Sequence, residues 1–168
     1  MKVDGMMLYL AYGTNIPTIE MADRAKDATC YGWGVISNYR MAFGSGGFAT
    51  LLPAKGMSTP VAIYSCSQND FSRLDVYEGC PHFYHKESMT YIPKAVRYCF
   101  KPDSFIGIVY VMNPGNKIML PNARALKTAA DGYRELGMPL KELEAAAKWS
   151  AVHKGELIEE GKDYGGEY

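Results

Sequence analysis

The run Met6–Tyr12 constrains the fold more than any other segment of the chain. Its side chains alternate between two faces that are both largely apolar, which is typical of a central strand covered on both sides. The run ends abruptly at Gly13-Thr14-Asn15, and Pro17 then suits the first turn of a helix. The sequence therefore predicts a buried strand that turns sharply into a helix. One face of the strand carries Met6, Leu8, Leu10 and Tyr12, and the other carries Met7, Tyr9 and Ala11.

The turn after this strand is a candidate binding loop. Gly13 permits a backbone turn that a Cβ atom would forbid, and Asn15 is suited to cap the following helix. Free N–H groups at the start of a helix attract carboxylates and developing oxyanions. The same pattern is also typical of an ordinary strand–turn–helix connection. We therefore assign this loop a binding role only together with a second feature of the sequence.

That second feature is a carboxylate on the apolar face of a short helix. Ser67 is a suitable N-cap and Gly79 a suitable C′ residue for a helix between them. Phe71, Leu74 and Glu78 share one face of this helix, and the two apolar members direct that face towards the core. Partial burial would raise the pKa of Glu78 and make it a stronger base than a solvated glutamate. The alternative is a frayed helix end with Glu78 in solvent.

The two motifs, Y-G-T-N at Tyr12–Asn15 and L-D-x-x-E-G at Leu74–Gly79, resemble those of the gamma-glutamylcyclotransferase-like (AIG2-like) family. The chain departs from the family pattern at Thr14, where Ser is usual, and at Pro121–Ala125, which lacks a tyrosine that many relatives carry. The resemblance covers residues 6 to 145 and includes four further segments in the same order: Asn38–Phe43, Gly47–Pro53, Pro60–Tyr64 and Gly137–Pro139.

The resemblance implies an enzyme that converts a gamma-glutamyl amine or gamma-glutamyl peptide to 5-oxoproline and the free amine or amino acid. It implies that Glu78 is the catalytic general acid and base, and that neither a cofactor nor a metal is needed. Tyr84 and Tyr77 lie close to the motifs in sequence and are candidates to line the pocket with apolar rings and polar tips. The residues expected to bind the substrate are Tyr12, Gly13, Thr14, Asn15 and Tyr84.

A second hypothesis is a non-catalytic protein of the same fold that binds a small anionic or nucleotide-like ligand. Tyr12 or Tyr84 would then stack against the ligand, and the tyrosine missing near Ala123 keeps this alternative open. A third is a partner-binding role for the acidic C-terminal segment. The sequence does not identify the leaving amine or the oligomeric state.

Length and charge indicate one soluble domain. The chain has 168 residues, and 18 basic side chains balance 18 acidic ones, so nothing points to nucleic acid or a membrane as partner. The apolar stretch before Gly13 is too short for a signal peptide, which favours a cytoplasmic location and reduced cysteines. We expect a domain over residues 1–155 and an acidic tail over 156–168, free to move unless it covers the pocket. The cysteines are Cys30, Cys66, Cys80 and Cys99.

Three other groups of residues offer alternative functional sites, and each has a simpler explanation. Cys80, His82 and His85 lie close together in sequence, but their spacing matches no common zinc pattern. A catalytic pair of Cys80 or Cys66 with a histidine has no sequence signature behind it. Gly44–Gly47 is glycine-rich but lacks the lysine of a phosphate-binding P-loop, and a hairpin turn is the simpler interpretation.

Many strands with few inserted helices predict an α+β fold with a mixed, barrel-like sheet and a few flanking helices. The two strands on either side of Pro93-Lys94 are expected to form a hairpin. The predicted strands are 6–12, 28–36, 39–43, 48–52, 60–66, 83–91, 95–101 and 105–112. The predicted helices are 16–26, 68–78, 122–136 and 139–152.

Overall fold

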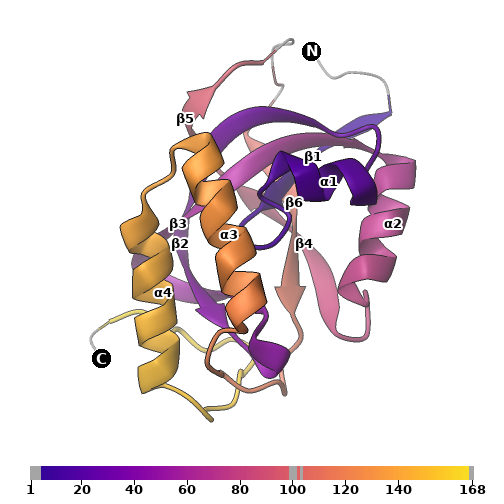
Figure 1. Cartoon of the computed structure of the whole chain (residues 1–168). Helices are drawn as coiled ribbons and strands as arrows, with labels where there is room; N and C mark the ends of the chain where they lie inside the picture. The colour runs from indigo at the N-terminus through magenta and orange to yellow at the C-terminus, as the bar shows by residue number, and fades with distance from the viewer. Residues whose placement is uncertain (1–4, 99–101, 103, 167–168) are drawn as a thin grey trace.

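A six-stranded mixed sheet forms the centre of the molecule (Figure 1). The structure is a computed structural model that describes residues 5–98, 102 and 104–166. Strand β1 (Met6–Ala11) pairs with β3 on one side and with β6 (Ile106–Met112) on the other, and Tyr9, Leu10 and Ala11 are buried. The prediction of a central strand here is confirmed. The strand order is β4-β6-β1-β3-β2-β5.

Strands β2 (Thr29–Phe43) and β3 (Ala49–Ser67) form one long hairpin, where the sequence predicted four short strands. That prediction was wrong because the expected breaks are tolerated inside the strands. Asn38 adopts a left-handed conformation (φ 64°) at a bulge, and the pairing resumes beyond it. Pro53 and Pro60 lie where β3 pairs with β2 alone, so the missing N–H can face the unpaired edge. The glycine-rich segment makes the hairpin turn, as predicted, with a 3-10 helix at Ser45–Gly47 (η1).

The sheet curls until its two edge strands come close together. Strands β4 (Tyr84–Thr90) and β5 (Ile92–Val96) stand at opposite ends of the strand order, yet Tyr91 alone separates them in sequence. Two residues of extended chain span about 7 Å, so the edges must meet at this point. The sheet is therefore barrel-like in curvature, as predicted, although no ladder between the described strands closes it.

The predicted hairpin around Pro93-Lys94 was wrong. Both residues belong to β5, and β5 pairs with β2 at the far edge of the sheet instead of with β4. Local turn signals cannot reveal this pairing, because it depends on the curl of the whole sheet. The last residues of the predicted strand 95–101 lie outside the described residues.

Helix α2 (Gln68–Glu78) has the predicted boundaries, and its ends explain why. The Ser67 hydroxyl accepts a hydrogen bond from the Asp70 N–H (3.1 Å), and the Asp70 carboxylate accepts one from the Ser67 N–H (3.0 Å). Gly79 then ends the helix in the left-handed conformation (φ 64°). This double cap fixes where the last residue of the helix, Glu78, stands.

The remaining helices cover other parts of the sheet. Helices α3 (Ala123–Leu136) and α4 (Leu140–Val152) lie side by side, and α4 packs on β2 (Figure 1). Helix α1 (Thr18–Arg24) is shorter than the predicted 16–26 and contacts α2. No helix in the described part of the chain has both the length and the apolar character needed to cross a membrane.

The described part of the C-terminal segment packs against the domain. Ile158 and Tyr164 are buried, and the Tyr164 N–H donates to the Pro53 carbonyl (2.7 Å). The Asp163 carboxylate accepts a hydrogen bond from the Lys55 N–H (2.9 Å). Asp163 and Tyr164 thus lie against β3, while residues 156–158 hydrogen-bond to the segment 115–118. The division of the chain at residue 155 stays a prediction.

Gly132 in α3 should resist the substitution that normally stabilises a helix. A Cβ atom there would lie 2.4 Å from Cγ2 of Ile16 and 2.9 Å from Cδ of Pro17. Replacing a helix-interior glycine with alanine usually gains about 1 kcal/mol. Here Gly132→Ala is expected to lower the free energy of unfolding by about 1–3 kcal/mol through overpacking, measured by urea denaturation.

The matched control is Glu144→Ala on the exposed face of α4, which should change the free energy of unfolding little. A Gly132→Ala protein more stable than wild type would mean that α3 can shift away from the loop without cost.

Candidate active site

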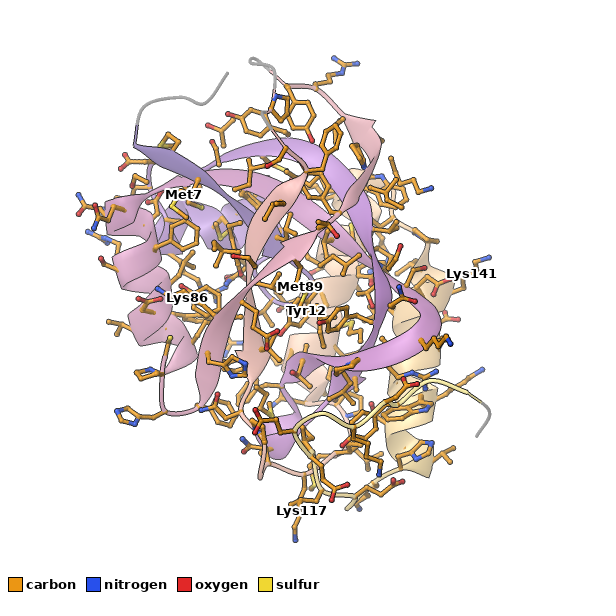
Figure 2. The ribbon with its side chains drawn as sticks, turned by 180° about the vertical axis from the view of Figure 1, so that it is seen from behind. Met7, Tyr12, Lys86, Met89, Lys117 and Lys141 are labelled. Atoms are coloured by element: carbon orange, nitrogen blue, oxygen red, sulfur yellow. The ribbon has the colours of Figure 1, made fainter. Side chains whose placement is uncertain are left out.

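A cavity of about 230 Å³ opens between the β1–α1 loop, the end of α2 and the starts of β3 and β4. Tyr12, at the end of β1, lies in the middle of the molecule, well inside the peripheral Lys117 and Lys141 (Figure 2). All six residues proposed from the sequence line this cavity: Tyr12, Gly13, Thr14, Asn15, Glu78 and Tyr84. The other lining residues are Tyr9, Phe48, Ala49, Tyr77, Phe83 and Tyr110.

The Glu78 carboxylate faces this cavity from the last turn of α2. Phe71 and Leu74 on the same helix face are buried, while Glu78 is half-buried, as the spacing of the three residues predicted. Burial raises the pKa of Glu78 from its ordinary value of 4.5 to about 7, against the opposing effect of the Arg24 charge. A carboxyl group with this pKa can both accept and return a proton at neutral pH, as general acid–base chemistry requires.

The side-chain amide of Asn15 connects the loop to Glu78. Nη1 of Arg24 donates to Oδ1 of Asn15 (2.6 Å), and because a guanidinium can only donate, this contact fixes the orientation of the amide. Nδ2 therefore faces the cavity, where it donates to the Tyr9 hydroxyl (3.0 Å) and to Oε1 of Glu78 (3.4 Å). The amide thus holds a donor next to the carboxylate, which favours the charged form of Glu78.

Arg24 supports the loop from outside the cavity. Its Nη1 also donates to the Thr14 carbonyl (3.2 Å), and its guanidinium lies 3.9 Å from the centre of the Tyr77 ring. Nη2 pairs with the Glu20 carboxylate one turn earlier in α1 (3.2 Å). The Tyr77 hydroxyl in turn hydrogen-bonds to the Thr14 hydroxyl (3.2 Å). One cation therefore joins the loop, α1 and the end of α2.

Two expectations about the loop need correction. Asn15 does not cap the following helix: Pro17 is the N-cap of α1, and the Asn15 side chain is engaged by Arg24 instead. Gly13 does not adopt a positive φ. A Cβ atom at Gly13 would instead lie 3.2 Å from Cβ of Ala49, so the close approach of β3 is what restricts this position.

Gly13, Thr14 and Asn15 line the cavity, and their backbone N–H groups are candidate donors. The Gly13 carbonyl accepts from the Ile16 N–H (3.1 Å), which closes the turn. Within the described residues, no acceptor pairs with the backbone N–H groups of Gly13, Thr14 and Asn15. Three successive N–H groups without protein partners are suited to a carboxylate or an oxyanion.

Three buried tyrosines around the cavity, Tyr9, Tyr12 and Tyr84, keep their hydroxyls protonated. Burial, followed by the nearby Glu78 carboxylate, raises the pKa of Tyr9 and of Tyr84 above the ordinary value of 10.0. The Tyr84 hydroxyl donates to the Ala49 carbonyl (2.6 Å), and the Tyr12 hydroxyl donates to the Tyr110 carbonyl. Tyr12 and Tyr84 are therefore fixed by hydrogen bonds to the backbone, and the Tyr9 hydroxyl by the Asn15 amide.

Sequence reasoning missed several residues that shape the cavity. Phe48 follows the glycine-rich turn, Phe83 precedes β4, and Tyr110 lies in the middle of β6. Each lies in a segment whose local pattern indicates only a strand or a turn. Arg24 stands at the end of α1, and no motif distinguishes it from a basic residue placed to favour the helix terminus.

The described residues do not form the competing sites. The His85 ring lies between Asn113 and Glu87, at 2.6 Å from each, and His82 is exposed. Among the described residues, no three His, Cys, Asp or Glu side chains gather as a metal site. Cys30, Cys66 and Cys80 are free thiols whose pKa burial raises, which opposes a reactive thiolate. Cys99 lies outside the described residues.

Comparison with known proteins decides the family. Residues 9–132 match the family described as "Gamma-glutamyl cyclotransferase, AIG2-like". The chain belongs to this family. It is 24% identical over 170 residues to the gamma-glutamylcyclotransferase of Bos taurus, across 93% of this chain and 86% of the relative.

Solved structures show the same fold. A structure titled "Gamma-glutamyl cyclotransferase" matches with a TM-score of 0.69 at 18% identity, over 94% of this chain and 93% of that one. An uncharacterized protein from Homo sapiens matches with a TM-score of 0.69 at 19% identity, over 98% and 94% of the two chains. The family match identifies an enzyme of the gamma-glutamylcyclotransferase type, so the alternative of a non-catalytic binding protein is not favoured.

Removing the Arg24 charge should raise the pKa of Glu78 above about 7, because Arg24 is the group that opposes the effect of burial. Arg24→Met keeps much of the side-chain length and deletes the charge and the bond to Asn15. The pKa can be followed by carbon-13 NMR titration of the glutamate carboxyls. Arg73→Met, at an exposed position on α2, is the control and should leave the titration unchanged. An unchanged pKa in Arg24→Met would refute the assigned electrostatic role.

The buried carboxylate should make stability depend on pH. The folded-state pKa of Glu78 is about 7 and its ordinary value is 4.5, so between these values the unfolded chain loses a proton that the folded chain keeps. Raising the pH through this window therefore destabilises the fold, by on the order of 1–3 kcal/mol in total. Glu78→Gln lacks this loss, so its stability relative to wild type should increase from pH 4.5 to pH 8, measured by urea denaturation.

The control for this experiment is Glu144→Gln, an exposed residue of α4, which should follow wild type across the same pH range. A constant difference between Glu78→Gln and wild type would mean that the Glu78 carboxylate is well solvated.

Proposed function

We propose that this enzyme converts a gamma-glutamyl amine or gamma-glutamyl peptide to 5-oxoproline and the free amine or amino acid, with Glu78 as general acid and base. The observation that carries the proposal is the half-buried Glu78, whose pKa of about 7 suits proton transfer, in one cavity with the unpaired loop N–H groups. Membership of the family supports the reaction class. No cofactor takes part in the proposed reaction.

The reaction begins with the alpha-ammonium group of the substrate beside Glu78. The carboxylate takes one proton, and the freed amine nitrogen attacks the gamma-carbonyl carbon of the same molecule. A five-membered ring closes as the new C–N bond forms, and the carbonyl oxygen becomes an oxyanion. Collapse of this intermediate breaks the original amide C–N bond, and Glu78 returns its proton to the leaving nitrogen. The ring nitrogen then gives up its second proton, which Glu78 passes to the released amine, so the products are the neutral lactam and an ammonium ion.

Two further features of the cavity favour this chemistry. The attack is intramolecular, so holding the glutamyl chain in a folded conformation supplies much of the rate enhancement. The N–H groups of Gly13, Thr14 and Asn15 are available to bind the alpha-carboxylate and the developing oxyanion. Tyr12 and Tyr84 form walls against which the glutamyl chain can pack.

Replacing Glu78 with glutamine should nearly abolish turnover while substrate binding persists. Glutamine keeps the shape and hydrogen-bonding capacity of the side chain but cannot accept the proton. The loss in kcat is expected to be about 10²–10⁴-fold, the usual contribution of a positioned acid–base group. The assay is release of 5-oxoproline from gamma-glutamyl dipeptides and gamma-glutamyl amines.

Glu144→Gln serves as a control for the loss of one carboxylate and should turn over as wild type does. Circular dichroism of both variants checks that the fold is retained. A Glu78→Gln enzyme within about tenfold of wild-type activity would exclude Glu78 as the acid–base residue.

A further inference from the structure

The wall of the cavity limits which amine the substrate can release. We propose that the enzyme prefers gamma-glutamyl amides whose leaving amine bears an aromatic ring, carries no carboxylate and has no second charged group. This inference rests on the proposed function and names the substrate class for it. Three properties of the cavity support it: an aromatic opening, hydroxyls that are already engaged, and the balance of charge.

The opening of the cavity is aromatic. Phe48 and Tyr77 both line it and are 44% and 46% exposed, which places them between the interior and solvent. Phe83 also lines the cavity, and its ring packs edge-on against Tyr84 with 5.0 Å between the centroids. Exposed aromatic rings grouped around a cavity are typical of a binding surface, since covering them with an apolar group removes that surface from water. The leaving group must occupy this opening if the glutamyl end occupies the loop.

The tyrosine hydroxyls in the wall leave few polar contacts for a leaving group. Those of Tyr12 and Tyr84 donate to backbone carbonyls, and that of Tyr110 donates to Oδ1 of Asp75 (2.6 Å). The Tyr77 hydroxyl is paired with that of Thr14. These side chains therefore present ring surfaces to a ligand, and they fit an apolar group better than a hydrogen-bonding one.

The balance of charge disfavours a leaving group with its own carboxylate. Among the described residues that line the cavity, none is Lys, Arg or His, and Glu78 provides the one carboxylate. An amino-acid leaving group would therefore bring a second carboxylate close to Glu78, while the charge of Arg24 nearby is already engaged by Glu20 and Asn15.

A second ammonium on the leaving group is also disfavoured. The guanidinium of Arg24 already lies over the Tyr77 ring, so a ligand cation at this ring would meet a like charge. A neutral aromatic group avoids both conflicts and covers the exposed rings.

The inference is tested with four matched substrates. Gamma-glutamyl phenethylamide and gamma-glutamylphenylalanine differ only in the carboxylate, and the ethylamide lacks only the ring. The mono-gamma-glutamyl amide of 1,4-diaminobutane adds a second ammonium. The phenethylamide is expected to have a kcat/KM at least about tenfold above each of the others, a difference within reach of one apolar or one unpaired charged group. Equal or faster turnover of any of the other three would overturn the inference.

Substitutions then test whether the preference for an aromatic leaving group arises at the opening of the cavity. Phe48→Ala should lower kcat/KM for the phenethylamide about tenfold more than for the ethylamide. Phe105→Ala is the matched control, because Phe105 is 47% exposed and does not line the cavity. Thermal melts check that both variants fold. An equal effect of Phe48→Ala on both amides would show that the ring does not contact the leaving group.

Failure of the inference is distinguishable from failure of the proposed function. If none of the four compounds yields 5-oxoproline, the proposed function fails. Affinities of the intact compounds, measured by calorimetry on the Glu78→Gln protein, then decide the inference separately. Tighter binding of the phenethylamide than of the other three supports the aromatic preference, and equal or weaker binding overturns it.

Discussion

The side-chain amide of Asn15 is the interaction on which the arrangement of the cavity depends. The amide is buried, and its two ends have different partners. Its oxygen accepts a hydrogen bond from Arg24, and its nitrogen donates to Tyr9 and Glu78. Because Arg24 can only donate, the amide cannot be reversed without leaving donors opposed to one another. The loop after β1, the end of α1 and the end of α2 therefore adopt one relative position. The proton transfer proposed for Glu78 requires the carboxylate to be held in one position, and these contacts hold it there.

These contacts surround the carboxylate of Glu78, and burying a charged carboxylate costs free energy. The last turn of α2 carries Glu78 into a cavity whose walls are largely aromatic, and the capping of this helix by Ser67, Asp70 and Gly79 sets where the carboxylate stands. Burial and the charge of Arg24 act in opposite directions on its pKa, which settles at about 7. The protein thus combines local helix capping, which is favourable, with partial desolvation of a charge, which is not. Such a local conflict is common at functional sites.

What could be predicted from the sequence is what depends on neighbours along the chain. The 3.6-residue spacing and the two caps predicted α2 and the inward position of Glu78, and the apolar faces of Met6–Tyr12 predicted β1. What failed depends on contacts between distant segments. Pro53, Pro60 and Asn38 resemble strand breakers until the pairing of β2 with β3 is known. Asn15 resembles a helix cap until Arg24 is placed beside it. The aromatic wall joins residues 48, 83 and 110, which no local pattern can bring together.

The separation between the loop and the aromatic opening has a consequence for how such an enzyme can evolve. Phe48 and Phe83 have no side-chain hydrogen-bonding groups, and they belong to segments other than those that carry Asn15 and Glu78. Substitutions at these two positions can reshape the opening without breaking a polar contact in the loop. Enzymes that carry out the proposed reaction can therefore diverge in the amine they release while the residues around Glu78 stay unchanged, so one ring closure can serve different metabolites.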